Sequence, residues 1–241
     1  MIYLRSAIFA LALIVFTPPY ALIATLSFPF RPITRYRAIT GWTHIMLWVL
    51  KHIVGIDYKV EGRKNIPNVP SIVLCKHQSA WETLALQKIL PPQAYVLKKE
   101  LLWVPFFGWG LAQFPIISID RAAGQNALAQ VIEQGRKLLA SGIWVVVFPE
   151  GTRTAPGTKR RYKMGGACLA AEAGVPVVPI AHNAGEFWRR NAFLKYPGIV
   201  TVSIGPAFDA AGMSPDEINA KAEAWIEAEM HRISPERYAP A

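Results

Sequence analysis

Seven short apolar runs alternate with helix-like stretches along most of this chain, and this alternation limits its fold more than any other feature. The runs begin after Asp57, and each is bounded by turn-forming or charged residues. Such alternation is typical of an α/β layer architecture. We expect strands at 58–60, 71–75, 94–97, 114–119, 143–148, 175–180 and 200–204.

Two helices are also well marked. Apolar residues between 128 and 139 recur on one face of a helix that we expect to end before Gly142. Ser214 followed by Pro215, with Glu217 three residues after the serine, is typical of a helix start. Its apolar residues share one side and predict packing on the sheet: Ile218, Ala222, Trp225, Ile226, Met230 and Ile233.

The N-terminal region carries no charge over the 25 residues between Arg5 and Arg31. That length is enough for a helix that crosses a hydrocarbon core of about 30 Å. Pro18 and Pro19 interrupt it and remove two backbone donors, so two short helices that dip into one leaflet are an equal alternative. No Ala-x-Ala-like site closes the segment, which argues against a cleaved signal peptide. We expect a membrane-associated helical region at 1–56 and an α/β domain at 57–241.

The chain is both apolar and basic, with 52% hydrophobic residues and a net charge of +10. This balance is typical of a protein at an anionic membrane surface or near acidic substrates. Seven basic residues lie between Arg31 and Lys64 against two acidic ones, which predicts a cytoplasmic position for this flank. Apolar residues from Ile39 to Ile53 recur at helical spacing, and they suit core packing and membrane contact equally.

Several classes of partner and site are not expected. A nucleic-acid partner is disfavoured because the chain has no basic helix, zinc-ligand spacing or interleaving of aromatic and basic residues. Cys75 and Cys168 have no disulfide or redox spacing. The histidines show no metal-ligand spacing, so we expect no metal site.

His77 is the first candidate catalytic residue. It follows the strand expected at 71–75, and ligands bind at the carboxyl edge of open α/β sheets. Glu82 stands five residues later and can accept a hydrogen bond from one imidazole nitrogen. The other nitrogen can then take a proton from a hydroxyl group, as in a serine protease triad with the substrate's alcohol in place of the serine. An alternative stays open, because Ser79 and Glu82 also match a capping box at a helix start.

The run Phe148-Pro149-Glu150-Gly151-Thr152-Arg153 is the second candidate site segment. It follows the strand expected at 143–148, so it shares an edge with His77 if the strands are parallel. Gly151 allows close approach of the backbone, and Arg153 can contact a phosphate in bidentate geometry. Cations also follow other strands, which predicts an anion pocket: Lys98, Lys99, Arg121, Lys159, Arg160, Arg161 and Lys163.

These segments resemble, in order, the four sequence blocks of the glycerolipid acyltransferase family, in particular its bacterial 1-acyl-sn-glycerol-3-phosphate acyltransferases. The resemblance runs from about Gly62 to Pro206, through the blocks 77–82, 119–121, 148–153 and 175–180. It implies a mixed, largely parallel β-sheet flanked by helices, and a place at the cytoplasmic face of the inner membrane. It also implies that His77 is the base, that Glu82 is its partner, and that Arg121 and Arg153 hold the acceptor's phosphate together with a lysine after the strand at 94–97. We expect seven substrate-binding residues, of which the cations clamp the phosphate: Lys98, Arg121, Glu150, Gly151, Thr152, Arg153 and Lys163.

Two residues depart from the family pattern. The usual acid is aspartate, whereas Glu82 is longer by one methylene group. The residue before the histidine is commonly asparagine, and here it is Lys76. Neither departure removes a group that the chemistry needs.

We therefore expect an enzyme that transfers a fatty acyl group from acyl-CoA or acyl-acyl carrier protein to the sn-2 hydroxyl of 1-acyl-sn-glycerol 3-phosphate, forming phosphatidic acid. No acyl-enzyme and no cofactor are expected beyond the donor substrate. The expected partners are the lysophospholipid acceptor, the acyl donor and the membrane lipid surface.

Three other functions are alternatives. An acyltransferase with another acceptor, such as glycerol 3-phosphate, another lysophospholipid or an amino-lipid, would carry the same residues. A non-catalytic lipid-binding protein would explain the apolar N-terminus but not the histidine–acid pair. A lipid hydrolase is disfavoured because no Gly-x-Ser-x-Gly turn occurs. The sequence does not predict the donor, the acyl-chain length, the exact acceptor or the oligomeric state.

Overall fold

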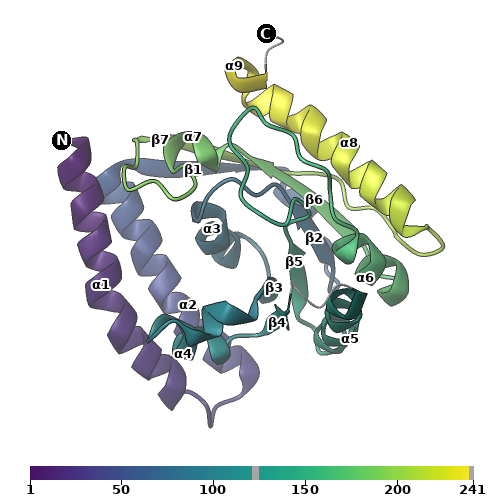
Figure 1. Cartoon of the computed structure of the whole chain (residues 1–241), viewed down its shortest axis with the longest axis horizontal. Coiled ribbons are helices and arrows are strands. Elements are labelled where there is room, and N and C mark those ends of the chain that lie inside the picture. The colour runs from purple at the N-terminus through teal and green to yellow at the C-terminus, as the bar shows by residue number, and fades with distance from the viewer. Residues whose placement is uncertain (121–124, 239–241) are drawn as a thin grey trace.

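A computed structural model describes residues 1–120 and 125–238, in which one β-sheet lies between two groups of helices (Figure 1). The strand order is β1-β7-β6-β2-β5-β3-β4. Strands β2 to β6 are parallel to one another, and β1 is parallel to β7, which runs antiparallel to β6. The sheet is mixed and largely parallel, as expected.

All seven expected strands are present with small differences at their ends. Strand β4 begins two residues later than expected and β6 ends two residues later, at His182. The strands are β1 (Ile56–Glu61), β2 (Ile72–Cys75), β3 (Gln93–Lys98), β4 (Ile116–Ile119), β5 (Trp144–Val147), β6 (Val177–His182) and β7 (Gly198–Ile204).

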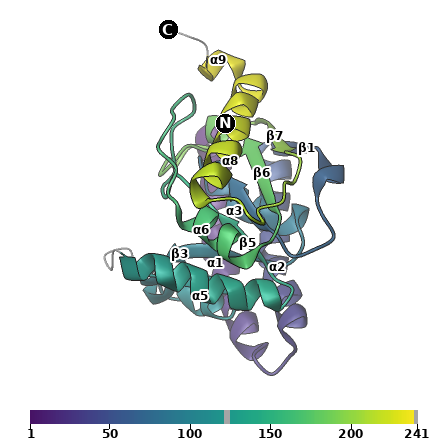
Figure 2. The same cartoon turned by 90° about the vertical axis from the view of Figure 1, so that its right-hand side faces the viewer.

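The sheet is buried on both faces, and neighbouring residues of β2 show this directly. Val73 and Cys75 belong to a core cluster that includes α1 (Ile2–Leu26), α2 (Pro32–Val49) and α3 (Trp81–Ile89). Ile72 and Leu74 belong to a second cluster with α5 (Gln125–Ala140), α6 (Gly165–Ala173) and α8 (Pro215–Ile233). Figure 2 shows the latter group of helices in front of the sheet. Because both faces are covered, these strands are continuous apolar runs without alternation.

Short elements connect these layers. Helix α4 (Phe107–Ala112) packs on the 3-10 turn η3 (Lys99–Trp103) that precedes it, and α4 lies beside α1. The others are η1 (Leu50–Val54), η2 (Arg63–Asn65), α7 (Ala184–Phe187) and α9 (Pro235–Tyr238).

Helix α8 begins as expected. Ser214 Oγ accepts from the Glu217 backbone N–H, while the Glu217 carboxylate accepts from the Ser214 backbone N–H. Pro215 occupies the first turn, where a missing N–H costs nothing. The helix also packs on the sheet, since Ile218, Ala222 and Ile226 are fully buried.

Helix α1 is continuous through Pro18 and Pro19, so the two separate short helices considered above do not form. Each proline removes one donor and leaves the carbonyl four residues earlier without its helical partner, but the surrounding hydrogen bonds hold the helix together. The helix is long and apolar enough to cross a membrane, with a mean hydropathy of 2.1 in its most apolar window.

The helical pair α1–α2 packs on the α/β layers. Phe9 and Met46 are fully buried in the same cluster as Val73 and Trp81. Part of the expected 39–53 helix therefore contributes to the core, while Trp48 remains exposed. The division of the chain between residues 56 and 57 stays a prediction.

Candidate active site

His77 and Glu82 form the expected pair at the carboxyl edge of β2. His77 Nδ1 lies 2.7 Å from Glu82 Oε1. Since a carboxylate only accepts, Nδ1 is the donor, and the other ring nitrogen of a neutral His77 is an acceptor. The ring stacks on Phe148 at 4.0 Å between centroids, which fixes its plane. The geometry suits a base that takes a proton from a bound hydroxyl group.

Glu82 also holds the loop that carries His77. Its Oε1 accepts the backbone N–H groups of Gln78 and Ser79, both at 2.9 Å. Helix α3 begins at Trp81, whose N–H donates to Ser79 Oγ at 3.1 Å. Together with the Glu82 bond to the Ser79 N–H, this gives the helix start contacts of the capping kind, so Glu82 supports the helix start as well as His77. Burial raises the pKa of the Glu82 carboxyl, but the hydrogen bonds that it accepts from His77 and from the Ser79 N–H favour the charged form, and its pKa lies below the usual value. Glu82 is therefore ionised at neutral pH and supports a protonated His77.

His182, at the end of β6, was not recognised from the sequence. Its Nε2 donates to the Lys76 carbonyl at 2.7 Å, and its Nδ1 accepts the Ala184 N–H at 3.2 Å. These two bonds require the neutral ring, and burial lowers its pKa. His182 thus braces the backbone before His77. Its position at the end of a buried parallel strand was the available signal.

Glu150 is fully buried and joins the two site segments. Its Oε2 accepts the His77 backbone N–H at 2.7 Å, and its Oε1 lies 3.0 Å from Lys76 Nζ. Thr154 holds the other side of the same peptide segment, since its N–H donates to the His77 carbonyl at 2.8 Å. Burial raises the pKa of Glu150, against the opposing effect of Lys76. We propose that Glu150 holds the His77 loop instead of contacting substrate.

Lys76 is fully buried with its charge shared between two carboxylates. Its Nζ lies 2.8 Å from Glu227 Oε1 on α8, in addition to Glu150. Tyr162 donates to the same Glu227 oxygen at 3.0 Å. Burial lowers the pKa of Lys76, but Glu150 and Glu227 together raise it above its usual value, so the side chain stays charged. This cluster connects the C-terminal helix to the residue directly before the base.

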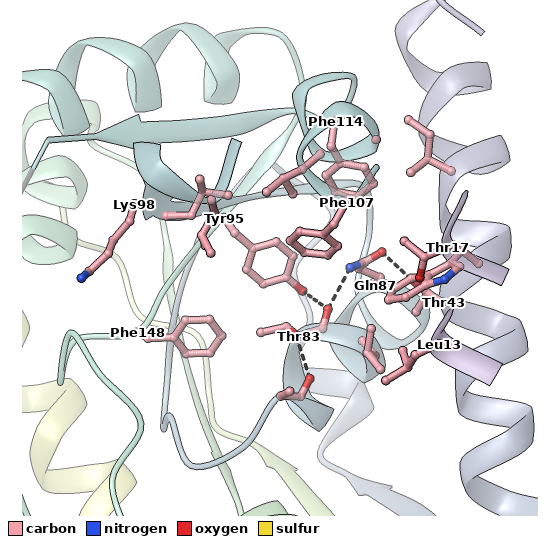
Figure 3. Close-up of a pocket in the computed structure, with 18 of the residues that line it drawn as sticks. Leu13, Thr17, Thr43, Thr83, Gln87, Tyr95, Lys98, Phe107, Phe114 and Phe148 are labelled. Carbon is pink, nitrogen blue, oxygen red and sulfur yellow. Dashed lines mark hydrogen bonds between the residues drawn. The ribbon is translucent and has the colours of Figure 1, made fainter. Parts of the chain in front are cut away.

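A cavity of about 620 Å³ opens beside His77. Figure 3 shows Lys98 at one end and Leu13 and Thr17 of α1 at the other, with the rings of Tyr95 and Phe148 between them. Side chains from α1, α2, α3, β3 and α4 form walls that are mostly apolar. A cavity of this shape can hold an extended hydrocarbon chain whose polar end lies at His77.

Hydrogen bonds fix the cavity walls to one another. Thr43 of α2 donates to Gln87 Oε1 of α3 at 2.9 Å, and Tyr95 of β3 donates to the Thr83 carbonyl at 3.1 Å (Figure 3). Burial raises the pKa of Tyr95 well above its ordinary value, so it stays a neutral donor. These bonds join α2, α3 and β3 around the apolar cavity.

Four of the seven expected substrate-binding residues line the same cavity as His77. They are Lys98, Gly151, Thr152 and Arg153. Lys99, by contrast, pairs with Asp120. Arg121 lies outside the described residues. The binding roles of all these residues stay predictions.

Gly151 is in close contact with Lys163, which does not itself line the cavity. Gly151 has a φ of +69°, and a Cβ there would come within 2.8 Å of Lys163 Cε. The lysine side chain therefore lies over the turn, where only glycine leaves it room.

Arg190 is a further cation that the sequence reasoning missed. It lines the same cavity, and its Nη1 donates to the Arg153 carbonyl at 3.3 Å. In the sequence, only the pair Arg189-Arg190 pointed to a cation here. The pair does not directly follow a strand, so the rule that ligands bind where strands end could not indicate it. Within the described residues no group of three metal-ligating side chains comes together.

The chain is similar to known proteins in sequence and in fold. A family model described as Acyltransferase matches residues 57–183. The chain is 46% identical over 219 residues to the 1-acyl-sn-glycerol-3-phosphate acyltransferase of Pseudomonas aeruginosa, covering 88% of this chain and 85% of that protein. It is 32% identical over 182 residues to the human 1-acyl-sn-glycerol-3-phosphate acyltransferase alpha, covering 74% of this chain and 64% of the human one.

A solved structure has the same fold. The crystal structure of the 1-acyl-sn-glycerophosphate (LPA) acyltransferase PlsC from Thermotoga maritima matches with a TM-score of 0.80, over 95% of this chain and 94% of that one. The sequence identity is 24%, so this likeness concerns the fold.

Proposed function

The chain belongs to the acyltransferase family, and on that premise we propose that it acylates the sn-2 hydroxyl of 1-acyl-sn-glycerol 3-phosphate, with acyl-CoA or acyl-acyl carrier protein as donor. One observation carries the proposal: the His77–Glu82 pair stands where an apolar cavity meets several cations. A lysophospholipid has the same three parts, namely a hydroxyl group, an acyl chain and a phosphate.

The reaction follows from the position of His77. Its free ring nitrogen takes the proton of the sn-2 hydroxyl as that oxygen attacks the thioester carbonyl. The C–O bond forms, the C–S bond breaks, and the departing thiolate takes the proton back from the imidazolium. Glu82 stabilises that imidazolium through Nδ1. No bond between enzyme and acyl group is needed.

Positioning is the second contribution of the site. Lys98, Arg153 and Arg190 would hold the phosphate so that the hydroxyl meets His77, and Arg153 can do so in bidentate geometry. Orientation of this kind can supply about 7–11 kcal/mol of a barrier. The apolar walls would hold an acyl chain away from water.

We further propose that α1 lies along one leaflet instead of crossing the bilayer. Its Ser6 accepts a hydrogen bond from the Lys195 backbone N–H, and a Cβ on Gly110 of α4 would lie 3.7 Å from Ala21 Cα. These contacts are about 23 Å apart at 1.5 Å per residue. A helix fixed to the folded domain over most of the core thickness cannot cross the membrane without leaving it. The basic flank then suits the cytoplasmic face.

Mass spectrometry of the products tests the function. Purified protein and its His77→Ala variant are given 1-acyl-sn-glycerol 3-phosphate with palmitoyl-CoA or palmitoyl-acyl carrier protein. We expect phosphatidic acid from the unchanged protein and about 10²–10⁴-fold less from the variant. Equal product from both would overturn the assignment of the base, and product only from another acceptor would overturn the substrate.

A further inference from the structure

The segment that follows β3 has an unusual outer surface. Residues 101–119 contain no Asp, Glu, Lys or Arg. Six large apolar side chains within nine positions are exposed, far more than an ordinary protein surface presents in one place. They are Leu101, Trp103, Val104, Phe106, Phe107 and Trp109. Leu101, Phe106 and Phe107 also line the cavity, so Trp103, Val104 and Trp109 form the outer surface.

This segment is a firmly built platform. The Phe107 N–H donates to the Pro105 carbonyl, and Phe106 between them has a φ of +60°, which is a rare and strained γ-turn. Gly108 packs so closely that a Cβ there would lie 2.2 Å from the Leu102 carbonyl oxygen. Phe106 and Trp109 contact each other with centroids 5.0 Å apart. The backbone is thus held in an unfavourable conformation that leaves Trp103 and Trp109 exposed on the outer side.

The platform continues the apolar surface of α1. Helix α4 packs on α1 where Gly110 approaches Ala21 and Ala24, so small residues bring the two helices into close contact. An exposed apolar stripe also runs along most of α1, at Leu4, Ile8, Leu11, Val15, Leu22 and Leu26. The two surfaces therefore meet at the α1–α4 contact.

We infer that η3 and α4 form a second contact with the lipid bilayer, beside α1, with Trp103 and Trp109 at the level of the headgroups. Tryptophan suits this level because its ring is apolar and its N–H is polar. Trp103 is 76% exposed and Trp109 is 55% exposed. The surface offers no charge to pair with a protein partner, whereas the chain's net charge of +10 favours an anionic lipid surface.

The inner side of the same segment explains what such contact would do. Phe107 and Phe114 line the cavity beside His77 (Figure 3), while Trp103 and Trp109 lie outside that lining. The wall between lipid and cavity is thus one short turn and one short helix. Inserted in the bilayer, this wall would bring the cavity level with the acyl chains, so that a lipid substrate need not cross water.

Site-specific labelling tests the inference without turnover. Trp103→Cys, made with Cys168→Ser, is labelled with an environment-sensitive fluorophore and mixed with vesicles of phosphatidylethanolamine and phosphatidylglycerol. The matched control is Val69→Cys, an exposed apolar site before β2 and so at the opposite edge of the sheet. We expect the label at position 103 to shift to shorter wavelength and to lose most of its quenching by iodide, while the label at position 69 changes little.

Three outcomes would overturn the inference. One is a label at position 103 that stays open to iodide while co-sedimentation shows the protein bound to vesicles. Another is protection without vesicles that grows with protein concentration, which would indicate a second copy on this surface. The third is unchanged vesicle binding by the double variant Trp103→Glu, Trp109→Glu. We expect its binding to weaken by at least roughly tenfold, because two aromatic side chains that would be buried in the bilayer are lost.

The labelling experiment can succeed or fail independently of the test of the proposed function, on which the inference rests. Both need lipid at this edge of the sheet, but the label reports insertion even if the acceptor is another lipid. Conversely, phosphatidic acid formed in detergent micelles would support the reaction even if the label stayed in water.

Discussion

The backbone N–H of His77 donates to Glu150 Oε2 at 2.7 Å, although 73 residues separate the two in the chain. The turn after β5 therefore holds the loop after β2 by a charged hydrogen bond within the fully buried part of the site. The two loops follow adjacent parallel strands, so both lie at the same edge of the sheet and can contact each other. The base is positioned through its own backbone as well as through its ring.

Glu150→Gln should destabilise the protein. If the amide oxygen stays with Lys76, its NH₂ group faces the His77 N–H, and a buried donor is left without an acceptor. We expect a loss of about 1–3 kcal/mol in the free energy of unfolding, measured by denaturant titration in detergent. The matched control is Glu133→Gln, whose solvent-exposed pair with Lys137 should contribute little to stability. Equal effects of the two variants would contradict a special role for Glu150.

Lys76→Met should be more costly, because it leaves two buried carboxylates without their cation. Breaking a buried ion pair in this way typically costs about 3–5 kcal/mol. Adding Glu227→Leu should restore part of this loss, since it removes one of the unpaired charges. A double variant no more stable than the single one would show that Lys76 acts through another contact.

The deficit of Lys76→Met should also depend on pH. Burial already raises the pKa of Glu150 in the folded protein, and removing Lys76 takes away a group that opposes this. A carboxyl group with a raised folded-state pKa favours folding when protonated, and that advantage is lost as pH rises through the folded-state value. Thermal unfolding at pH 5.5 should therefore show a smaller difference between variant and unchanged protein than at pH 7.5. A larger difference at pH 5.5 would contradict the assignment.

Glu82→Gln separates charge from geometry. The amide oxygen can still accept from His77 Nδ1 and from the two backbone N–H groups, but it no longer stabilises the imidazolium. We expect kcat to fall by about 10²–10⁴-fold with little change in the KM for the acceptor. Glu82→Asp keeps the charge but has a shorter side chain, so its kcat should lie between those of the unchanged protein and Glu82→Gln. A kcat for Glu82→Gln within threefold of the unchanged protein, roughly 0.7 kcal/mol, would exclude Glu82 from the chemistry.

The strands, and the edge of the sheet where the site lies, could be predicted from the sequence because both follow from local rules. Buried parallel strands appear as apolar runs, and the residues after them gather at one edge. Thus His77, Glu82 and Arg153 could be placed near one another from the sequence. The burial of Glu150 could not, since it depends on Lys76 and on Glu227 from a helix near the end of the chain.

Local rules left choices open that packing decides. Pro18 and Pro19 allow a break, but α1 stays continuous on the domain surface. The S-x-x-E pattern allows a cap or a catalytic pair, and the Glu82 carboxylate both accepts the Ser79 N–H and holds the His77 ring. Arg190 reaches the cavity from a loop whose course depends on α7 and β7, so no spacing indicates it.

Arg153→Ala and Arg190→Ala should weaken use of the phosphorylated acceptor. Both guanidinium groups belong to side chains that line the cavity, and a charge-assisted bond to phosphate is worth about 1.5–3 kcal/mol. We expect each variant to raise the KM for 1-acyl-sn-glycerol 3-phosphate by roughly ten- to a hundredfold, with the KM for the donor changed much less. The control is Arg160→Ala, which removes an exposed cation outside the cavity lining. If Arg160→Ala raises the acceptor KM as much as Arg153→Ala does, the effect is that of overall charge, and Arg153 and Arg190 do not form the phosphate site.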